Sequence, residues 1–331
     1  RCAGGASGDG DGSGDGDASG DGDGSGDGDA SGEGEGDASG DGDASGEGSG
    51  DGEARGEGDG SGEGEARGDG EALADTIKKE IAQQVEHLSV TPGLGTILVG
   101  DDPASQSYVG AKIRDCQEVG ISSIHEHLSE DITQHDLNAV IQRFNEDPQV
   151  HAYIVQLPLP NQLEEEAALL AIDPNKDADG LHPVNLGRLV MGVQGPLPCT
   201  PRGIQMMLEA YEIPVEGKHV CVIGRGLTIG RPMALLMALK RATANAAVTV
   251  IHTGVHNLAE YTRQADIVIA AAGVPNLVTP DMIKPGAAVI GGGLTRDGNR
   301  ILSDVDESVA DVAGWMTPRL GGVGPMMGQA N

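Results

Sequence analysis

Aromatic side chains are scarce in this chain of 331 residues, which has one Trp, four Tyr and one Phe. Cysteine is scarce too: there are four, and no two of them form a Cys-x-x-Cys pair. This pattern does not suggest a disulfide framework or a structural zinc site, so we predict no metal. We expect the thiols to be buried, in the reducing environment of the cytoplasm.

Basic residues are far outnumbered, with 21 Lys and Arg against 52 Asp and Glu and a net charge of −31. No basic patch is available to neutralise phosphates, so we do not expect nucleic-acid binding. No apolar run approaches the ~20 residues of a membrane span, and there is no signal-peptide pattern. We therefore expect a cytoplasmic protein. The chain starts at Arg1 rather than Met, which suggests a fragment, a processed form or an unusual gene product.

Residues 1–68 form a segment of their own, with 20 Asp and Glu, three Arg, no Lys and 27 of the 54 glycines. Such a segment buries too little apolar surface to offset the entropy of ordering, which predicts a disordered tail. It repeats units such as SGDGDA. A polyanionic spacer and translated repetitive DNA are both compatible with this pattern. Calcium-binding β-roll repeats share the Gly-x-Gly-x-Asp pattern but also need regularly placed apolar residues, which this segment lacks.

Residues 69–331 show the alternation of strands and helices that is typical of an α/β fold with a parallel sheet. Aliphatic runs predict strands at 94–99, 152–156, 219–223, 248–251, 267–271 and 287–290. Helical periodicity predicts helices at 73–88, 106–118, 134–145, 203–211 and 230–241. We place a domain boundary near residue 190, which gives a first domain at 69–190 and a dinucleotide-binding domain at 191–331.

A glycine-rich turn follows the predicted strand 219–223 and opens a helix. Gly224, Gly226 and Gly230 let the backbone approach a pyrophosphate, and the helix N-terminus supplies free N–H groups. The spacing Gly-x-Gly-x-x-x-Gly is one residue longer than the usual dinucleotide fingerprint. A tight turn that binds nothing therefore stays possible on this motif alone.

Arg225 in the same turn is placed to meet the 2′-phosphate of NADP. An NAD-binding unit usually has an acidic residue at the end of the next strand. Here that strand leads into His252 and Thr253 instead. The sequence thus favours NADP over NAD.

The first domain also carries polar candidates. Tyr108 and Lys112 are four residues apart, which places them on one helix face. Such a pair is usually solvated, but this one follows a buried strand and an Asp-Pro-Ala-Ser loop, a common place for a site. Gln156 ends a strand, where an amide either points into a crevice or caps the chain.

Two further segments stand out. Asp177-Ala178-Asp179-Gly180 is an acidic turn, which in isolation is a loop or half of a metal site. Gly321-Gly322-Val323-Gly324-Pro325 has backbone small enough for close contact with a flat ligand or a neighbouring loop.

The order of these motifs is more specific than any one of them. The series reads Pro-Ala-Ser-Gln-Ser-Tyr-Val-x-x-Lys, Val-Gln-Leu-Pro-Leu-Pro, Lys-Asp-Ala-Asp-Gly, Pro-Cys-Thr-Pro-Arg-Gly, Val-Ile-Gly-Arg-x-x-x-x-Gly-Arg-Pro and Gly-Gly-Val-Gly-Pro-Met. From about 69 to 326 it closely resembles the bifunctional methylenetetrahydrofolate dehydrogenase/cyclohydrolase family. The resemblance implies a folate-binding α/β domain and a Rossmann-type NADP-binding domain. It also implies a homodimer that oxidises 5,10-methylenetetrahydrofolate and hydrolyses the product to 10-formyltetrahydrofolate.

The resemblance also implies roles for single residues. Lys112 would be the catalytic lysine, with Tyr108 lining the folate site and Gln156 hydrogen-bonding near the lysine. Asp179 would anchor the N–H groups of the pterin, which suit a carboxylate. The wall of the folate pocket would be Gly321, Gly322 and Val323. The cofactor would be held by Gly224, Arg225, Gly226, Gly230, His252 and Thr253.

This chain departs from the family pattern at four places. Gly226 replaces a Ser, Gly291-Gly292-Gly293 replaces Asp-Val-Gly, and Arg319-Leu320 replaces Val-Pro. The family also continues after Gly-Pro-Met with a helix that packs on the first domain, whereas this chain stops at Asn331, so we expect a weakened first domain. The alternatives to an active enzyme are an impaired folate- or NADP-binding relic and a protein whose acidic tail is the functional part.

Overall fold

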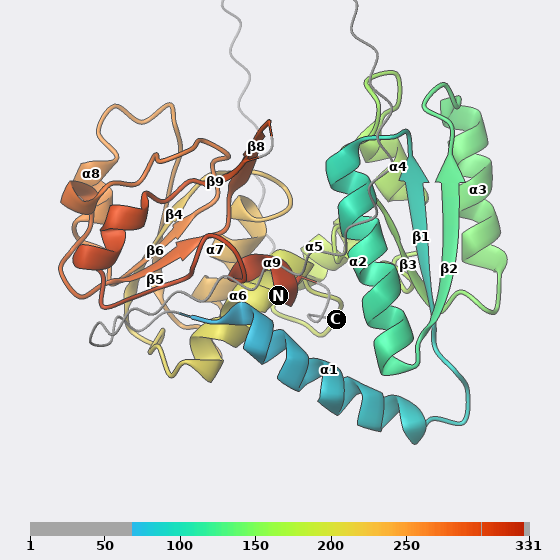
Figure 1. Cartoon of the computed structure of the whole chain (residues 1–331), viewed down its shortest axis with the longest axis horizontal. Coiled ribbons are helices and arrows are strands. Elements are labelled where there is room, and N and C mark those ends of the chain that lie inside the picture. Colours follow the sequence, from blue (N-terminus) through green and yellow to red (C-terminus); the bar gives the residue numbers. More distant parts are fainter. Residues whose placement is uncertain (1–67, 299, 328–331) are drawn as a thin grey trace, which may run out of the picture. The chain divides into compact units, whose positions relative to one another are not determined.

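Two lobes make up the described part of the chain, and each is built around its own parallel sheet (Figure 1). The computed structural model describes residues 68–298 and 300–327. These residues belong to one compact unit, Ser61–Asn331. The predictions for the acidic segment 1–68 fall on residues outside the described ones, Gly68 excepted.

The first lobe has three parallel strands in the order β2-β1-β3. The strands are β1 (Gly93–Val99), β2 (Ser122–Leu128) and β3 (Ala152–Val155). The helices between and after them are α2 (Pro103–Val119), α3 (Gln134–Glu146) and α4 (Glu165–Ala171). Alternate side chains of a strand share a face, so Ile97 and Val99 of β1 join one core cluster with α3 and α4. The first lobe thus has a core of its own, with α2 alongside β1 and β2 (Figure 1).

Short polar and glycine signals set the ends of α2. The carboxylate of Asp102 accepts a hydrogen bond from the backbone N–H of Ser105 at 2.7 Å, which satisfies a free donor of the first turn. At the other end Gly120 adopts a left-handed φ of 79° and stops the helix. The helix that carries two of the candidate residues therefore has a fixed start and a fixed end.

The second lobe has five parallel strands in the order β10-β7-β6-β4-β5. The strands are β4 (His219–Ile223), β5 (Ala247–Ile251), β6 (Ile267–Ala270), β7 (Ala288–Gly291) and β10 (Trp315–Met316). The α-helices of this half of the chain are α6 (Cys199–Ala210), α7 (Gly230–Ala238), α8 (Ala259–Thr262) and α9 (Val323–Met326). β4 comes first in the chain and has β5 on one side and β6 on the other. The strand order therefore reverses between β4 and β6, which is where α/β sheets bind ligands.

The α/β prediction with parallel sheets is confirmed, and the predicted strands lie within one residue of β1, β3, β4, β5, β6 and β7. The sequence did not predict β2, α4, α5 (Pro183–Met191), β10 or the antiparallel hairpin of β8 (Leu294–Asp297) and β9 (Arg300–Ser303). β2 is half polar and lies at the edge of its sheet, β8, β9 and β10 have four residues or fewer, and α4 and α5 span only 7 and 9 residues. Two short 3₁₀ helices, η1 (Pro280–Met282) and η2 (Glu307–Asp311), were not predicted either.

α1 (Gly70–Glu86) contacts both lobes. Ala74 on α1 is buried in the same core cluster as Ile204 and Met207 of α6. Farther along α1, Lys78 forms ion pairs with Asp115 and Glu118 of α2. α1 therefore belongs by contact to the second lobe at its start and to the first lobe in its later turns.

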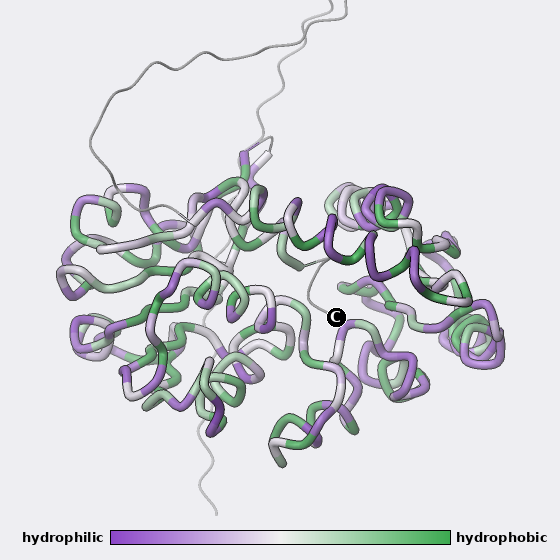
Figure 2. Tube along the Cα trace, turned by 90° about the horizontal axis from the view of Figure 1, so that it is seen from below, coloured by the Kyte–Doolittle hydropathy of each residue, from purple (hydrophilic) through white to green (hydrophobic). Residues whose placement is uncertain are grey.

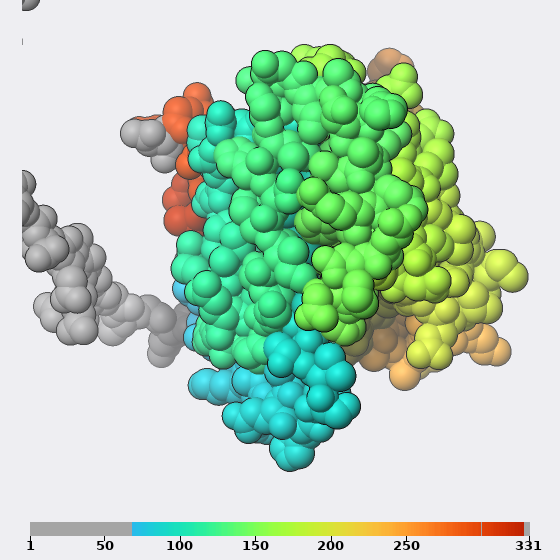
Figure 3. Space-filling view, turned by 90° about the vertical axis from the view of Figure 1, so that its right-hand side faces the viewer, coloured from blue at the N-terminus to red at the C-terminus, as the bar shows by residue number. Residues whose placement is uncertain are grey.

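Hydrophilic and hydrophobic residues alternate along the trace, as the purple and green stretches of Figure 2 show, and the apolar residues of β1, β4, β6 and β7 are largely buried. The first lobe's residues cover the face seen in Figure 3, and the end of α1 lies at its lower edge. None of the helices in the described ranges combines the length and apolarity that crossing a bilayer requires.

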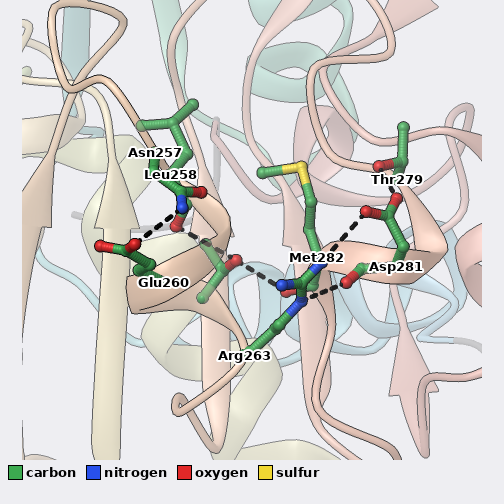
Figure 4. Close-up of polar contacts among 8 residues, drawn as sticks. Asn257, Leu258, Glu260, Arg263, Thr279, Asp281 and Met282 are labelled. Carbon is green, nitrogen blue, oxygen red and sulfur yellow. Dashed lines mark hydrogen bonds and ion pairs between the residues drawn. The ribbon is translucent and has the colours of Figure 1, made fainter.

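A polar clamp fastens α8 to η1 on the second lobe (Figure 4). The Nε of Arg263 donates to the backbone oxygen of Asp281 at 2.6 Å, and its guanidinium lies 3.3 Å from the carboxylate of the same residue. Buried Thr262 donates to the backbone oxygen of Met282 at 2.6 Å. These contacts hold the segments on either side of β6, whose carboxyl end supplies part of the site described next.

Candidate active site

A cleft of about 420 Å³ lies between the two lobes and is lined by both. The part of the chain before residue 190 contributes Tyr108, Lys112, Gln156, Leu157, Asp179 and Leu181. The part after it contributes Cys199, Thr200, Thr228, Ile229, Ala271, Ala272, Gly273, Gly291, Gly292, Gly293, Leu294, Arg319, Val323, Gly324 and Met327. Four of the polar or charged residues predicted from the sequence therefore share one cavity, although 71 positions separate Tyr108 from Asp179.

Tyr108 and Lys112 lie one turn apart on α2, and both side chains line the cleft. Tyr108 is 43% exposed, which leaves its ring available to a ligand. An exposed aromatic ring beside an amine suits a flat ligand that also needs a proton carrier.

Gln156 follows the last residue of β3, and its backbone N–H still donates to the oxygen of Ile97 at 2.9 Å. Its side-chain Nε2 donates to the backbone oxygen of Leu157 at 2.7 Å. Its Oε1 is buried and has no partner among the described residues. A buried acceptor without a donor costs free energy, and a ligand N–H in the cleft would relieve that cost.

Asp177 builds the turn that carries Asp179. Its carboxylate is 2% exposed and accepts hydrogen bonds from the backbone N–H of His182 at 2.9 Å and from Nδ2 of Asn185 at 2.8 Å. Gly180 completes the turn with a φ of 68°, and a Cβ there would lie 2.4 Å from the backbone of Leu197. Asp177 is thus committed to structure, which leaves Asp179 as the carboxylate that lines the cleft.

The described residues include no group of three or more His, Cys, Asp and Glu side chains arranged to hold a metal ion. In the described residues, Asp177 fixes the path of the acidic turn through its hydrogen bonds to His182 and Asn185.

The glycine-rich turn after β4 is tightly built at two of its glycines. Gly224 has a φ of 126°, and a Cβ there would lie 2.1 Å from the backbone oxygen of Ala271. A Cβ on Gly230 would lie 2.4 Å from the oxygen of Gly224. α7 begins at Gly230 without a side-chain cap, but its first turn has few donors left for an anion, because the N–H of Arg231 donates to the oxygen of Gly226 at 3.1 Å and Pro232 has no N–H. Gly226 is different, because a Cβ there would meet nothing within 4 Å.

Arg225, His252 and Thr253 lie at the ends of neighbouring strands rather than on the cleft itself. Ile223 pairs with Ile251, and Gly224 donates to the oxygen of Ile251 at 2.8 Å, so the turn after β4 lies next to the segment after β5. Arg225 and Thr253 are exposed. The predicted cofactor residues thus gather at the carboxyl edge of the sheet, beyond Thr228 and Ile229 of the cleft.

The glycines near the C-terminal end of the described chain divide into two sets. Val323 and Gly324 line the cleft, as predicted for Val323. Gly321 and Gly322 are not among the residues that line it, and they contact the start of α1 instead. Gly70 donates to the oxygen of Gly321 at 2.8 Å, and a Cβ on Gly70 would lie 1.8 Å from the oxygen of Gly322.

The departures from the family pattern also have a structural setting. The backbone N–H of Gly291 donates to Oγ1 of Thr317 at 2.9 Å, and a Cβ on Gly291 would lie 2.7 Å from Oγ of Ser303. Arg319 lines the cleft, and its Nε lies 3.1 Å from the carboxylate of Glu307. The Arg319–Glu307 ion pair thus anchors the loop around residue 320, where the family pattern has a proline.

Sequence reasoning missed the segment 271–273 and singled out 291–293 only as a departure from the family pattern. Both segments form much of the second lobe's wall. Both follow strands that were predicted, β6 and β7. The carboxyl ends of parallel strands meet at one edge, so that rule was the signal that could have found them.

Comparison with known proteins identifies a family that has both of these domains. Residues 69–179 match the family "Tetrahydrofolate dehydrogenase/cyclohydrolase, catalytic domain", and residues 198–329 match its "NAD(P)-binding domain". The chain is 56% identical over 256 residues to the bifunctional protein FolD of Syntrophotalea carbinolica, covering 76% of this chain and 88% of the relative. The crystal structure of the Campylobacter jejuni FolD enzyme has a TM-score of 0.76 and 44% identity, covering 79% of this chain and 94% of that one.

A second solved structure, the Trypanosoma brucei enzyme complexed with NADP cofactor and an inhibitor, has a TM-score of 0.75 and 37% identity, covering 79% of this chain and 93% of that one. Both family domains are present, with the catalytic domain before the NAD(P)-binding domain. The chain therefore belongs to the bifunctional tetrahydrofolate dehydrogenase/cyclohydrolase family and is a methylenetetrahydrofolate dehydrogenase and methenyltetrahydrofolate cyclohydrolase.

Proposed function

We propose that both reactions take place in the cleft between the lobes, with the folate held by the first lobe and NADP by the second. The observation that carries this assignment is the single cavity shared by Tyr108, Lys112, Gln156 and Asp179 and by the loops after β6 and β7. The overall reaction is oxidation of 5,10-methylenetetrahydrofolate to the 5,10-methenyl form, followed by hydrolysis to 10-formyltetrahydrofolate.

The first lobe offers two acceptors to the pterin. The carboxylate of Asp179 suits its amino and ring N–H groups, and Oε1 of Gln156 is a buried acceptor with no partner among the described residues. The exposed ring of Tyr108 supplies a flat surface beside them. Together these contacts fix the folate so that its methylene carbon faces the second lobe.

The second lobe fits a dinucleotide in two ways. The turn at Gly224 and Gly230 has no room for a Cβ, which suits a backbone that approaches a pyrophosphate, and the N-terminal end of α7 directs its positive dipole end toward the same turn. Arg225 supplies an exposed guanidinium for the 2′-phosphate, which favours NADP over NAD. When bound, NADP supplies the hydride acceptor for the oxidation.

The two steps place different demands on the protein. The nitrogen lone pairs on either side of the methylene carbon stabilise the cation left when hydride departs, so positioning dominates that step. In hydrolysis, water adds to the methenyl carbon, one of the two bridging C–N bonds breaks, and a proton is released. The amine of Lys112 is the group that takes a proton from the water and returns one to the departing nitrogen.

Substitution of Lys112 by Met tests the assignment, because it keeps the length of the side chain and removes the amine. We expect hydrolysis of added methenyltetrahydrofolate to fall by roughly 10²–10⁴. Some hydride transfer should survive, so the methenyl intermediate accumulates and can be followed by its absorbance. The exposed Lys79→Met is the matched control and should behave as wild type. Unchanged hydrolysis in Lys112→Met would reject the catalytic role.

We also infer that the protein is a cytoplasmic homodimer. The family resemblance supports the dimer, and the end of α5 exposes apolar surface that could take part in one, with Val190 63% and Met191 76% exposed. The buried thiols of Cys116 and Cys221 support a reducing compartment. Light scattering with size-exclusion chromatography gives the mass in solution, and a monomer at micromolar concentration would contradict the dimer.

A further inference from the structure

A carboxylate lies behind the cofactor wall of the cleft and is not among the residues that line it. Asp304 follows the last residue of β9 and is 0% exposed. The candidate roles described above make no use of it. Burial raises the pKa of this carboxyl group, and the hydrogen bonds it accepts from the backbone oppose that rise. A side chain of this kind is expensive to bury, so its contacts indicate what it does.

One set of contacts reaches the loop after β6. Oδ2 of Asp304 accepts hydrogen bonds from the backbone N–H groups of Ala272 at 2.6 Å and of Gly273 at 2.9 Å. Both of these residues line the cleft. Hydrogen bonds to a charged acceptor are stronger than those between neutral groups, so this carboxylate fixes the path of the loop.

A second set of contacts reaches the loop after β7. The backbone N–H of Asp304 donates to the oxygen of Gly293 at 3.1 Å. A Cβ on Gly293 would lie only 2.1 Å from Oδ2 of Asp304, so the carboxylate occupies the space that this glycine leaves. Gly293 lines the cleft as well. One side chain therefore touches both loops that the second lobe contributes to the cleft beside the switch point.

Oδ1 of Asp304 is buried and has no hydrogen-bond partner among the described residues. A structural cap alone would be served as well by a neutral acceptor, without an unpaired charged oxygen in the interior. Such a cost in folding free energy is typical of functional sites, which indicates that the geometry of the two loops matters to the reaction.

We propose that Asp304 is a positioning residue for hydride transfer, which holds the loops 271–273 and 291–293 at the separation that the nicotinamide end of the cofactor requires. The proposal rests on the proposed binding of NADP by the second lobe. It assigns Asp304 to the dehydrogenase step alone, because the first-lobe residues that serve hydrolysis do not touch it.

The test compares Asp304→Ala and Asp304→Asn in the full-length protein with Asp306→Asn. Asp306 is two residues away, and within the described ranges its side-chain hydrogen bonds go to Ser308, so it is a matched control. We expect Asp304→Ala to raise the KM for NADP by about tenfold or more, the effect of one lost hydrogen bond to a charged group. Hydrolysis of added methenyltetrahydrofolate should stay unchanged, and Asp304→Asn should recover part of the loss because its amide oxygen still accepts.

A second variant approaches the same contact from the other side and covers the case in which Asp304→Ala does not fold. Gly293→Ala places a methyl group where the carboxylate lies and should reproduce the rise in the KM for NADP. An unchanged KM in folded Asp304→Ala, or a parallel loss of both activities, overturns the positioning role. If the wild-type protein itself fails to reduce NADP, the proposed function has failed instead, and the two results are distinguishable.

Discussion

Two glycines in the turn after β4 illustrate how different the demands on neighbouring positions are. Gly224 has a φ of 126° and lies against the backbone of Ala271, whereas Gly226 faces open space. The first needs glycine for conformational and steric reasons. The second carries no such requirement, and the family resemblance gives a serine there.

Gly224→Ala should therefore lower stability by roughly 1–3 kcal/mol, the usual cost of a strained backbone position, and should also impair cofactor binding. The displaced atom would be the oxygen of Ala271, which lies on the wall of the cleft. Thermal unfolding measures the first effect and the KM for NADP measures the second. A variant with wild-type melting temperature and KM would show that the turn relaxes freely.

For Gly226→Ser we expect the opposite result, with stability unchanged and cofactor binding improved. The added side chain meets nothing within 4 Å, so the unfolding free energy should change by less than about 0.5 kcal/mol. Its hydroxyl can donate to a bound phosphate, which should tighten NADP binding by about 0.5–1.5 kcal/mol. Titration calorimetry with NADP separates this from a neutral change.

Arg225→Ala tests cofactor choice at the same turn. Loss of an exposed guanidinium that pairs with the 2′-phosphate should weaken NADP binding by about 1.5–3 kcal/mol and leave the use of NAD nearly unchanged. Steady-state kinetics with both cofactors gives the comparison. Equal losses with NADP and NAD would mean that Arg225 shapes the turn rather than reading the phosphate.

At the scale of elements, the predictable parts of the fold are those with a full period or a strong cap. β4 shows an aliphatic run, and α2 shows a cap at Asp102 and a stop at Gly120. β2 was not predicted, because Ser122–Leu128 is an edge strand with polar residues on its exposed positions. The β8–β9 hairpin carries a recognisable turn signal in Asp297-Gly298, but its strands are mostly polar.

The candidate site followed the same logic. Residues that carry chemistry, such as Lys112 and Asp179, stood out by type and were found in one cleft. Backbone walls such as 271–273 carry no distinctive side chain, so only the topology of the sheet reveals them. Gly321 and Gly322 matched the motif but contact the start of α1, a partner about 250 positions away that no local pattern indicates.

The edge strand β2 also sets a pH dependence. Partial desolvation, with a smaller effect from His127, lowers the pKa of His125, although this residue occupies an exposed position of the edge strand. Its Nδ1 lies 2.9 Å from Oγ1 of Thr96. A histidine with a depressed pKa binds its proton more readily in the unfolded chain, so stability is lost as the pH falls through the unfolded value of about 6.5. Urea unfolding between pH 7.5 and 5 should show this loss.

His125→Gln should flatten the fall in stability over that pH range, because glutamine does not titrate. His135→Gln is the control, since the His135 side chain is 92% exposed. An equal slope in wild type and His125→Gln would place the pH dependence elsewhere.

At the scale of the whole molecule, the cleft exists only because two independent cores are held facing each other. The predicted boundary near residue 190 falls between the two family domains, 69–179 and 198–329. The contacts cross it: α1 precedes the first sheet in the chain, yet Ala74 is buried in the core cluster of α6 and β4. A linear boundary cannot represent a helix that belongs to both lobes.

Lys78 makes the polar contacts that join α1 to α2 of the first lobe. Its Nζ lies 2.8 Å from the carboxylate of Glu118, 3.0 Å from that of Asp75 and 3.7 Å from that of Asp115, and its side chain is 14% exposed. The hydrogen bond to Glu118, followed by that to Asp75, raises the pKa of the Lys78 amine. One ammonium therefore faces three carboxylates at the joint between α1 and α2 and compensates part of their negative charge.

Lys78→Met should lower the unfolding free energy by about 1–2 kcal/mol, a value reduced for the partial exposure of the acidic partners. Its effect on activity should differ from that of Lys112→Met and of Asp304→Ala. Because the substitution loosens the helix that joins both walls of the cleft, dehydrogenase and cyclohydrolase rates should fall together. Lys79→Met, on the exposed face of the same helix, should match wild type. Added salt should narrow the gap in stability between Lys78→Met and wild type, since it screens the same ion pairs. Loss of one activity alone would show that α1 serves one lobe rather than joining the two.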